Sequence, residues 1–173
     1  MPITTLKDMY VAELRRAHRL EQLLAEALPL MEQAASERRL KLAFRSHAEE
    51  TEEHEEQVAA ILDDLLDEDD AGDDAASDDD ATLSALVAEW RALTAGMRAG
   101  PLRDAVLIAA AQRIEHYEIA IYGTLAAHAT TFEREEEAQI LEGILDEERD
   151  TDDLLTDLAE GVVNPAAIEA ELT

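Results

Sequence analysis

A chain of 173 residues that is 47% hydrophobic is long enough to bury the core of one domain. The absence of cysteine excludes disulfides, iron–sulfur clusters and thiol catalysis. With 42 acidic and 14 basic residues the formal net charge is −28, which disfavours binding to nucleic acid and to anionic membranes.

The charge and the N-terminal segment also indicate where the protein works. Lysine occurs only at Lys7 and Lys41. Self-repulsion on this scale is tolerated best where molar salt shortens the Debye length to roughly 3 Å, so the composition indicates adaptation to high salt. The segment MPITTLKDMY lacks the pattern of a signal peptide, and no apolar run approaches a membrane span. We therefore expect a cytoplasmic protein.

Two long amphipathic helices are predicted first, at about residues 4–35 and 36–67. Apolar residues recur in the first helix at steps of three and four, which keeps them on one face, and Glu21 falls on that face. We expect Ser36 to cap the second helix. Its inner face is apolar at both ends and polar at mid-length. The polar positions are His47, Glu50 or Thr51, and His54.

An acidic segment and a shorter helix follow. In residues 63–80, eleven of eighteen positions are Asp or Glu, which predicts a solvated loop over about 67–80. A shorter amphipathic helix is predicted at about 81–99, and Gly100-Pro101 separates it from the next helix.

Two further long helices are predicted at about 101–130 and 132–160, with Gly161 as the C-cap of the second. The inner face of the first carries Glu118, with Glu115 on its flank. The inner face of the second carries Glu148 and Asp152, whereas Glu147 is expected to face solvent. No segment shows sustained alternation of apolar and polar residues with period two, so the fold is predicted to be all-α.

The lengths of the connections predict the topology. The first two long helices, and likewise the last two, are joined by a few residues and must be antiparallel neighbours. About thirty residues separate the second long helix from the third. A four-helix bundle with one long crossover is the ferritin-like arrangement. We therefore predict one ferritin-like domain over residues 1–173, with an extra helix in its crossover.

Carboxylates on the inner faces of this bundle indicate a metal centre. A buried carboxylate is costly unless it is paired or bound to a cation. Coordination that is rich in oxygen and poor in imidazole favours iron or manganese over copper or zinc. The inward-facing residues are Glu21, Glu50, Glu115 with Glu118, and Glu148.

Helical spacing suggests how these groups would cooperate. Residues three or four apart share a face, so Glu50 can act with His47 or His54, and Glu148 with Asp152. The pattern leaves open whether the two histidines are ligands or hydrogen-bond partners of the glutamates. As a working hypothesis, Glu50 and Glu148 bridge two metal ions, and Glu21 and Glu118 are terminal ligands.

Several segments carry a resemblance to a known family. They are YVAEL at 10–14, LEQLL at 20–24, AF at 43–44 with HAEET at 47–51, DAVLIAAAQ at 104–112 with IEHYE at 114–118 and YGTL at 122–125, and LDEE at 145–148 with TD at 151–152. Together they closely resemble the YciE/YciF family of bacterial and archaeal ferritin-like stress proteins, some of which are labelled ferroxidases. The resemblance runs from Leu6 to about Asn164 and is absent only in the acidic loop.

The resemblance implies a ferritin-like bundle, a homodimer and a site for two Fe or Mn ions. The ligands that it implies are Glu21, Glu50, Glu115, Glu118 and Glu148. The pair Glu115-x-x-Glu118 is similar to the rubrerythrin variant of this helix. Two positions depart from the family pattern: Glu53 stands three residues after Glu50, with His54 next, and Thr151 stands three after Glu148. With the acidic composition, the resemblance points to a haloarchaeal member.

Three functions are consistent with these features. The first is an oxidoreductase in which a reduced metal pair donates electrons to O2 or peroxide, as in a ferroxidase. The second is iron binding or storage without sustained turnover. The third is a metal-free structural stress protein that acts through partner binding.

Overall fold

The computed structural model describes residues 3–69 and 81–172, except the side chains of residues 66–69, 82 and 83. The described part is helical and contains no strand. Its helices are α1 (Leu6–Ala34), α2 (Arg38–Asp69), α3 (Ala81–Thr94), α4 (Pro101–Thr131), α5 (Glu135–Leu158) and α6 (Asn164–Glu171), with a π-helical turn over Ala159–Val163. None of the described helices is both long enough and apolar enough to cross a membrane.

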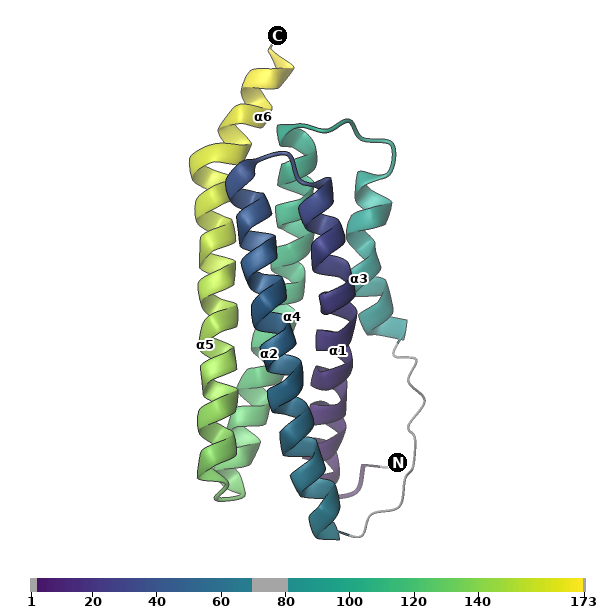
Figure 1. Ribbon diagram of the computed structural model, residues 1–173, viewed down its shortest axis with the longest axis vertical. Coiled ribbons are helices and arrows are strands. Elements are labelled where there is room, and N and C mark those ends of the chain that lie inside the picture. The colour runs from purple at the N-terminus through teal and green to yellow at the C-terminus, as the bar shows by residue number, and fades with distance from the viewer. Residues whose placement is uncertain (1–2, 70–80, 173) are drawn as a thin grey trace.

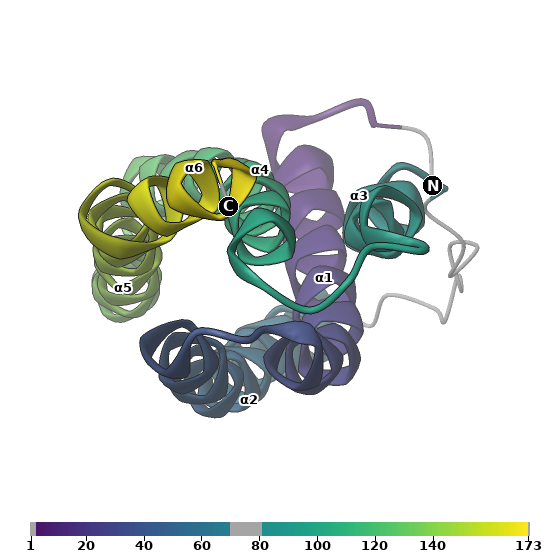
Figure 2. The ribbon, with the colours of Figure 1, turned by 90° about the horizontal axis from the view of Figure 1, so that it is seen from above.

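The four long helices form a bundle of two antiparallel hairpins (Figure 1). Helix α1 packs along α2, and α4 packs along α5. Helix α3 belongs to the crossover and lies outside the bundle, against α1 and α4 (Figure 2). The prediction of an all-α ferritin-like bundle with one long crossover and an extra helix is confirmed.

The ends of the first two helices are held by side-chain caps. Thr5 and Asp8 form a capping box at the start of α1, in which each side chain accepts from the other residue's backbone N–H. At the start of α2 the buried Asp104 of α4 accepts from the N–H groups of Ser36, at 2.7 Å, and Glu37, at 2.8 Å. Asp104 thus ties the connection before α2 to α4, and the cap of α2 is Glu37, whose side chain accepts from the N–H of Arg39 at 3.1 Å, whereas Ser36 was expected to provide it.

Two predicted helix ends were wrong. Helix α3 ends at Thr94, earlier than the predicted end near residue 99, and Gly96 adopts the left-handed backbone conformation with φ +76°. Gly161, expected to cap the fourth long helix, instead lies inside the π-helical turn that leads into α6. The predicted loop over about 67–80 lies outside the described residues, apart from the last turn of α2, which extends to Asp69.

Candidate metal centre

Buried carboxylates from three helices meet inside the bundle. Glu21 comes from α1, Glu115 and Glu118 from α4, and Glu148 from α5, and none of the four is more than 1% exposed. Helix α2 contributes His47 and His54, which are also buried. All six residues were singled out in the sequence, and the structure brings them together from positions up to 127 apart in numbering only because the two hairpins face one another.

The burial of side chains along α2 shows which of its polar residues face the core. His47, Thr51, His54 and Val58 are buried and follow one another at steps of four, three and four. Thr51 donates its hydroxyl to the carbonyl of His47 at 2.8 Å, so this buried hydroxyl has its hydrogen bond within α2. Because Thr51 occupies the inner position, its neighbour Glu50 is rotated by about 100° toward the edge of the helix.

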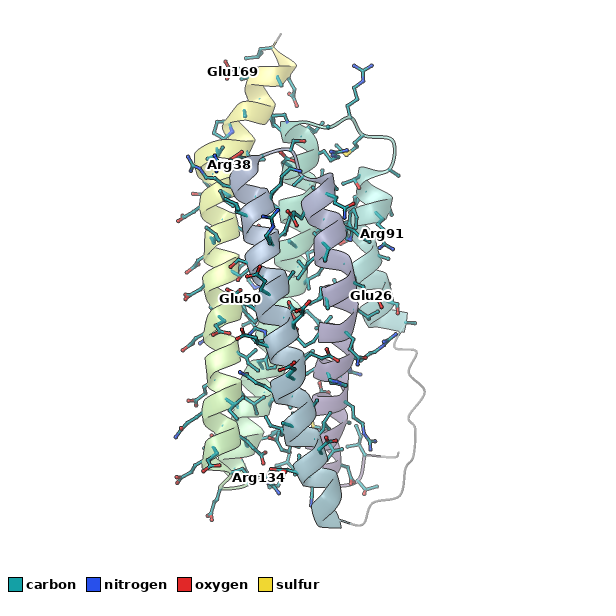
Figure 3. The ribbon with its side chains drawn as sticks, viewed as in Figure 1. Glu26, Arg38, Glu50, Arg91, Arg134 and Glu169 are labelled. Carbon is teal, nitrogen blue, oxygen red and sulfur yellow. The ribbon has the colours of Figure 1, made fainter. Side chains whose placement is uncertain are left out.

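The expectation that Glu50 faces the core was therefore wrong. Its side chain is 39% exposed, and its Oε2 lies 3.8 Å from Nδ1 of His47, beyond hydrogen-bond distance. Figure 3 places Glu50 near mid-height of the bundle. Asp152 also lies at the edge: it accepts from Gln112 at 3.2 Å and is 3.6 Å from Nε2 of His116.

Two groups of side chains in the described part of the chain could each hold a metal ion. One group is His47, Glu115, Glu118 and Glu148, and the other is Glu21, His54 and Glu148. In each group the ligand atoms lie within 4.8 Å of one another, and every member is buried. Glu148 belongs to both groups, whereas Glu50 and Asp152 belong to neither.

The donor atoms of these groups fit a cation. Both carboxylate oxygens of Glu118 and of Glu148 are buried without a hydrogen-bond donor, as is one oxygen each of Glu21 and Glu115. Nε2 of His47 and Nδ1 of His54 are likewise buried without a hydrogen bond. Polar atoms left in this state are expensive in a folded core. Carboxylate oxygens with a few imidazole nitrogens are a donor set suited to iron or manganese.

Burial also changes how these groups ionise. Burial, together with the charge of Glu148, raises the pKa of Glu21 to about 7 and that of Glu118 well above its usual value. Burial raises the pKa of Glu115 to about 8, against the opposing effect of His47. Burial alone would lower the pKa of the histidines, but the carboxylates outweigh it and raise the pKa of His47 to about 10 and of His54 to about 9. Without a cation, the cluster therefore retains protons.

Two residues outside these groups contact them. Tyr122 of α4 donates its hydroxyl to Oε1 of Glu21, and burial raises its pKa well above the usual value, so that it remains a donor. Glu147 accepts from the ring, with its Oε2 2.6 Å from Nε2 of His54. The expectation that Glu147 faces solvent is confirmed, since its side chain is 57% exposed, but helical periodicity contains no signal for this contact.

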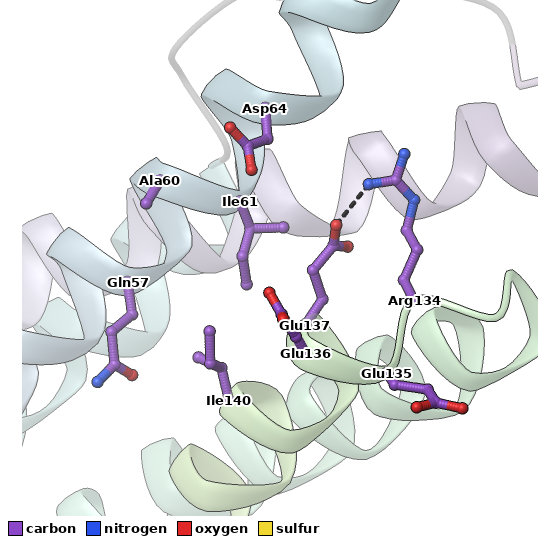
Figure 4. A pocket seen from close by; sticks show the side chains of 9 residues that line it. All are labelled: Gln57, Ala60, Ile61, Asp64, Arg134, Glu135, Glu136, Glu137 and Ile140. Atoms are coloured by element: carbon purple, nitrogen blue, oxygen red, sulfur yellow. Dashed lines mark hydrogen bonds and ion pairs between the residues drawn. The ribbon is translucent and has the colours of Figure 1, made fainter.

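A separate groove of about 470 Å³ lies between α2 and the start of α5. Figure 4 shows its lining, including the ion pair between Arg134 and Glu137. None of the predicted ligands lines it.

The bundle and its buried donor set define an all-α ferritin-like protein with a candidate metal centre. Residues 5–168 match the model of a family described as a domain of unknown function, DUF892. The chain is 35% identical over 167 residues to protein YciF of Escherichia coli K12, covering 96% of this chain and 98% of YciF. The chain belongs to this family of YciF-like proteins, which confirms the resemblance seen in the sequence.

Solved structures agree with this assignment. The crystal structure of the E. coli stress protein YciF has 34% identity and a TM-score of 0.83, covering 94% of this chain and 99% of that one. YcfI from Rhodopseudomonas palustris, whose description proposes a structural protein, has 30% identity and a TM-score of 0.78. The match covers 89% of this chain and 94% of YcfI. A protein from Xanthomonas campestris has 22% identity and a TM-score of 0.72, and the match covers 98% of this chain and 100% of that one. At this identity the similarity shows the fold alone.

Proposed function

We propose that this chain is a YciF-like stress protein that binds two Fe or Mn ions in the core of its bundle. The observation that carries the proposal is the position of Glu148, which is shared by both donor groups and has both oxygens buried without a donor. One ion would be held with His47, Glu115 and Glu118, and the other with Glu21 and His54. In this proposal Glu148 would hold both ions, as expected from the sequence, and Glu50 would hold neither.

The proposed reaction is that of a ferroxidase. A reduced metal pair would supply the electrons that O2 or peroxide accepts. The residues of the chain have other tasks. Tyr122 orients Glu21 through its hydroxyl, and the buried apolar core, which includes Ile114 and Leu145, would keep bulk water from the carboxylates. Because Glu21, Glu115 and Glu118 have raised pKa values, they would release protons as a cation binds.

A second candidate is a structural stress protein that stores metal or contains none. The description of the R. palustris relative as structural favours it. The unpaired oxygens argue against a core without a cation, because replacing them with apolar groups would relieve the cost of burying them. The two candidates differ in what the chain does with Fe(II), and that difference can be measured.

The test begins with metal analysis of full-length protein purified without chelator. Metal-free protein is then titrated with Fe(II) and Mn(II), and the consumption of O2 and of peroxide is recorded. We expect two ions per chain, with oxidant consumed in proportion to Fe(II). The variant Glu148→Ala should lose uptake at both positions, whereas Glu53→Ala, at an exposed position of α2, should retain it. Folded wild-type protein that takes up no metal would leave only a metal-free structural role.

Quaternary structure can be measured on the same samples. We retain the homodimer as part of the proposal. Sedimentation of the metal-free and the loaded chain would show whether the mass is that of one chain or two.

A further inference from the structure

The imidazole of His54 is enclosed by two consecutive carboxylates of α5. Its Nδ1 lies 3.0 Å from Oε1 of Glu148, and its Nε2 lies 2.6 Å from Oε2 of Glu147. Neighbouring residues of a helix point about 100° apart, so Glu148 enters the core while Glu147 follows the flank that faces α2. The ring of His54 spans the space between them.

The two carboxylates have opposite surroundings. Glu148 is fully buried, whereas the side chain of Glu147 is 57% exposed. His54 itself is only 1% exposed, and the edge of its ring packs against Tyr122 with the ring centroids 6.4 Å apart. His54 of α2 is thus held by Tyr122 of α4 and by Glu147 and Glu148 of α5. Of these three residues, Glu147 lies nearest the surface.

The identity of the ligand nitrogen depends on where the ring proton lies. A neutral imidazole carries one proton, and only the other nitrogen can bind a metal. A carboxylate 2.6 Å from Nε2 keeps the proton on that nitrogen. Nδ1 then remains available, and it is the nitrogen that has no hydrogen bond and faces Glu148.

Among the described residues, no outer carboxylate lies within hydrogen-bond distance of His47 in the way that Glu147 does of His54. Its outward nitrogen, Nδ1, is 3.8 Å from Oε2 of Glu50. Its inward nitrogen, Nε2, lies 3.4 Å from Oε1 of Glu115. Of the two histidines, His54 is therefore the one whose ring orientation is held by a hydrogen bond to an exposed carboxylate.

We propose that Glu147 is a positioning residue that holds the proton of His54 on Nε2 and so presents Nδ1 to a metal ion. The inference rests on the proposed function and adds a residue that acts through a ligand. Outer partners of this type commonly contribute a factor of about 10–100 to metal affinity. Glu147→Ala should therefore weaken one of the two metal positions by about that factor and leave the other close to wild type.

The experiment uses full-length protein and Zn(II), a diamagnetic probe. Competitive titration gives the stoichiometry and affinity, and ¹⁵N spectra of labelled histidines show which ring nitrogen binds the ion and which carries the proton. The wild-type chain should bind two Zn(II), with His54 ligated through Nδ1. Glu147→Gln, whose amide oxygen accepts the same hydrogen bond without a charge, should fall between wild type and Glu147→Ala. Glu142→Ala, at an exposed position on the same helix, is the matched control and should behave as wild type.

The possible results separate the two proposals. If Glu147→Ala binds both ions with wild-type affinity and an unchanged His54 spectrum, this inference is overturned and the proposed function stands. If the wild-type chain binds no Zn(II), this inference is overturned, and the proposed function is decided separately by the titrations with Fe(II) and Mn(II). Should Glu147→Ala lose helical content, Glu147→Gln decides: an intermediate affinity with His54 still ligated through Nδ1 supports the inference, and wild-type affinity overturns it.

Discussion

Glu118, like Glu148, has both of its carboxylate oxygens buried without a hydrogen-bond donor. Burial raises its pKa, and the same cause raises the pKa of Glu21 and Glu115. In an unfolded chain these groups would titrate near 4.5. A folded state with raised pKa values binds more protons than the unfolded state above that pH, so its stability decreases as pH rises.

The metal-free protein should therefore become less stable between about pH 5 and pH 8, the window set by the carboxyl pKa values of about 7 and 8 for Glu21 and Glu115. His47 and His54 act in the same direction above 6.5, because their stabilisation is lost as pH rises through their raised pKa values. Thermal unfolding followed by circular dichroism at several pH values measures the slope. Glu118→Gln should reduce it, since the amide does not titrate.

Bound metal should reverse this trend. Carboxylates must release their protons to bind a cation, so affinity rises with pH. The chain saturated with Mn(II) should unfold at a higher temperature at pH 8 than at pH 6. A metal-free protein that instead gains stability from pH 5 to pH 8 would contradict the assignment of protonated inner glutamates.

At the level of elements, the start of α2 depends on α4. Asp104 is buried and accepts two backbone N–H groups, from Ser36 and Glu37. These two N–H groups precede Arg38, the first residue of α2, and backbone donors withdrawn from water need a partner. The carboxylate of Asp104 supplies that partner and ties the α1–α2 connection to the first turn of α4.

Asp104→Ala should lower the free energy of unfolding by about 2–4 kcal/mol, because it leaves two backbone donors unsatisfied. Asp104→Asn should cost about half as much, since one oxygen acceptor remains. Urea unfolding measures both changes. As a control, Asp146→Ala removes a carboxylate that is 74% exposed and should stay within about 0.5 kcal/mol of wild type. Equal stabilities for Asp104→Ala and wild type would show that solvent satisfies these donors.

At the level of the whole molecule, the net charge of −28 opposes compaction. The charges on the outer faces of the long helices repel one another, and salt shortens the range of that repulsion from about 10 Å at 0.1 M to about 3 Å at 1 M. We propose that the chain is adapted to high salt for this reason.

The unfolding temperature should accordingly rise as KCl increases from 0.1 M to 1 M. The double variant Glu52→Lys and Glu56→Lys, at exposed positions of α2, should be more stable than wild type at low salt, with a smaller difference at 1 M. Calorimetry of both proteins across the salt series provides the comparison. An unfolding temperature that is independent of KCl would argue against salt adaptation.

Much of the fold was predictable from the sequence, because helical periodicity and the lengths of connections are local properties. Steps of three and four placed Glu21 and Glu118 on inner faces, and both are buried. A few residues between helices predicted the hairpins, and the long interval between the second and third predicted the crossover.

Other features depend on how whole helices are rotated and shifted against one another. Periodicity left Glu50 and Thr51 as alternatives, and the packing of α2 placed Thr51 inside. The hydrogen bond from Ser36 to Asp104 joins residues 68 apart, and the contact of His54 with Glu147 joins residues 93 apart. A single helix repeats every 3.6 residues and so specifies which side chains face inward. It carries no information about which residues of a distant helix they meet, because that is set only when the helices pack.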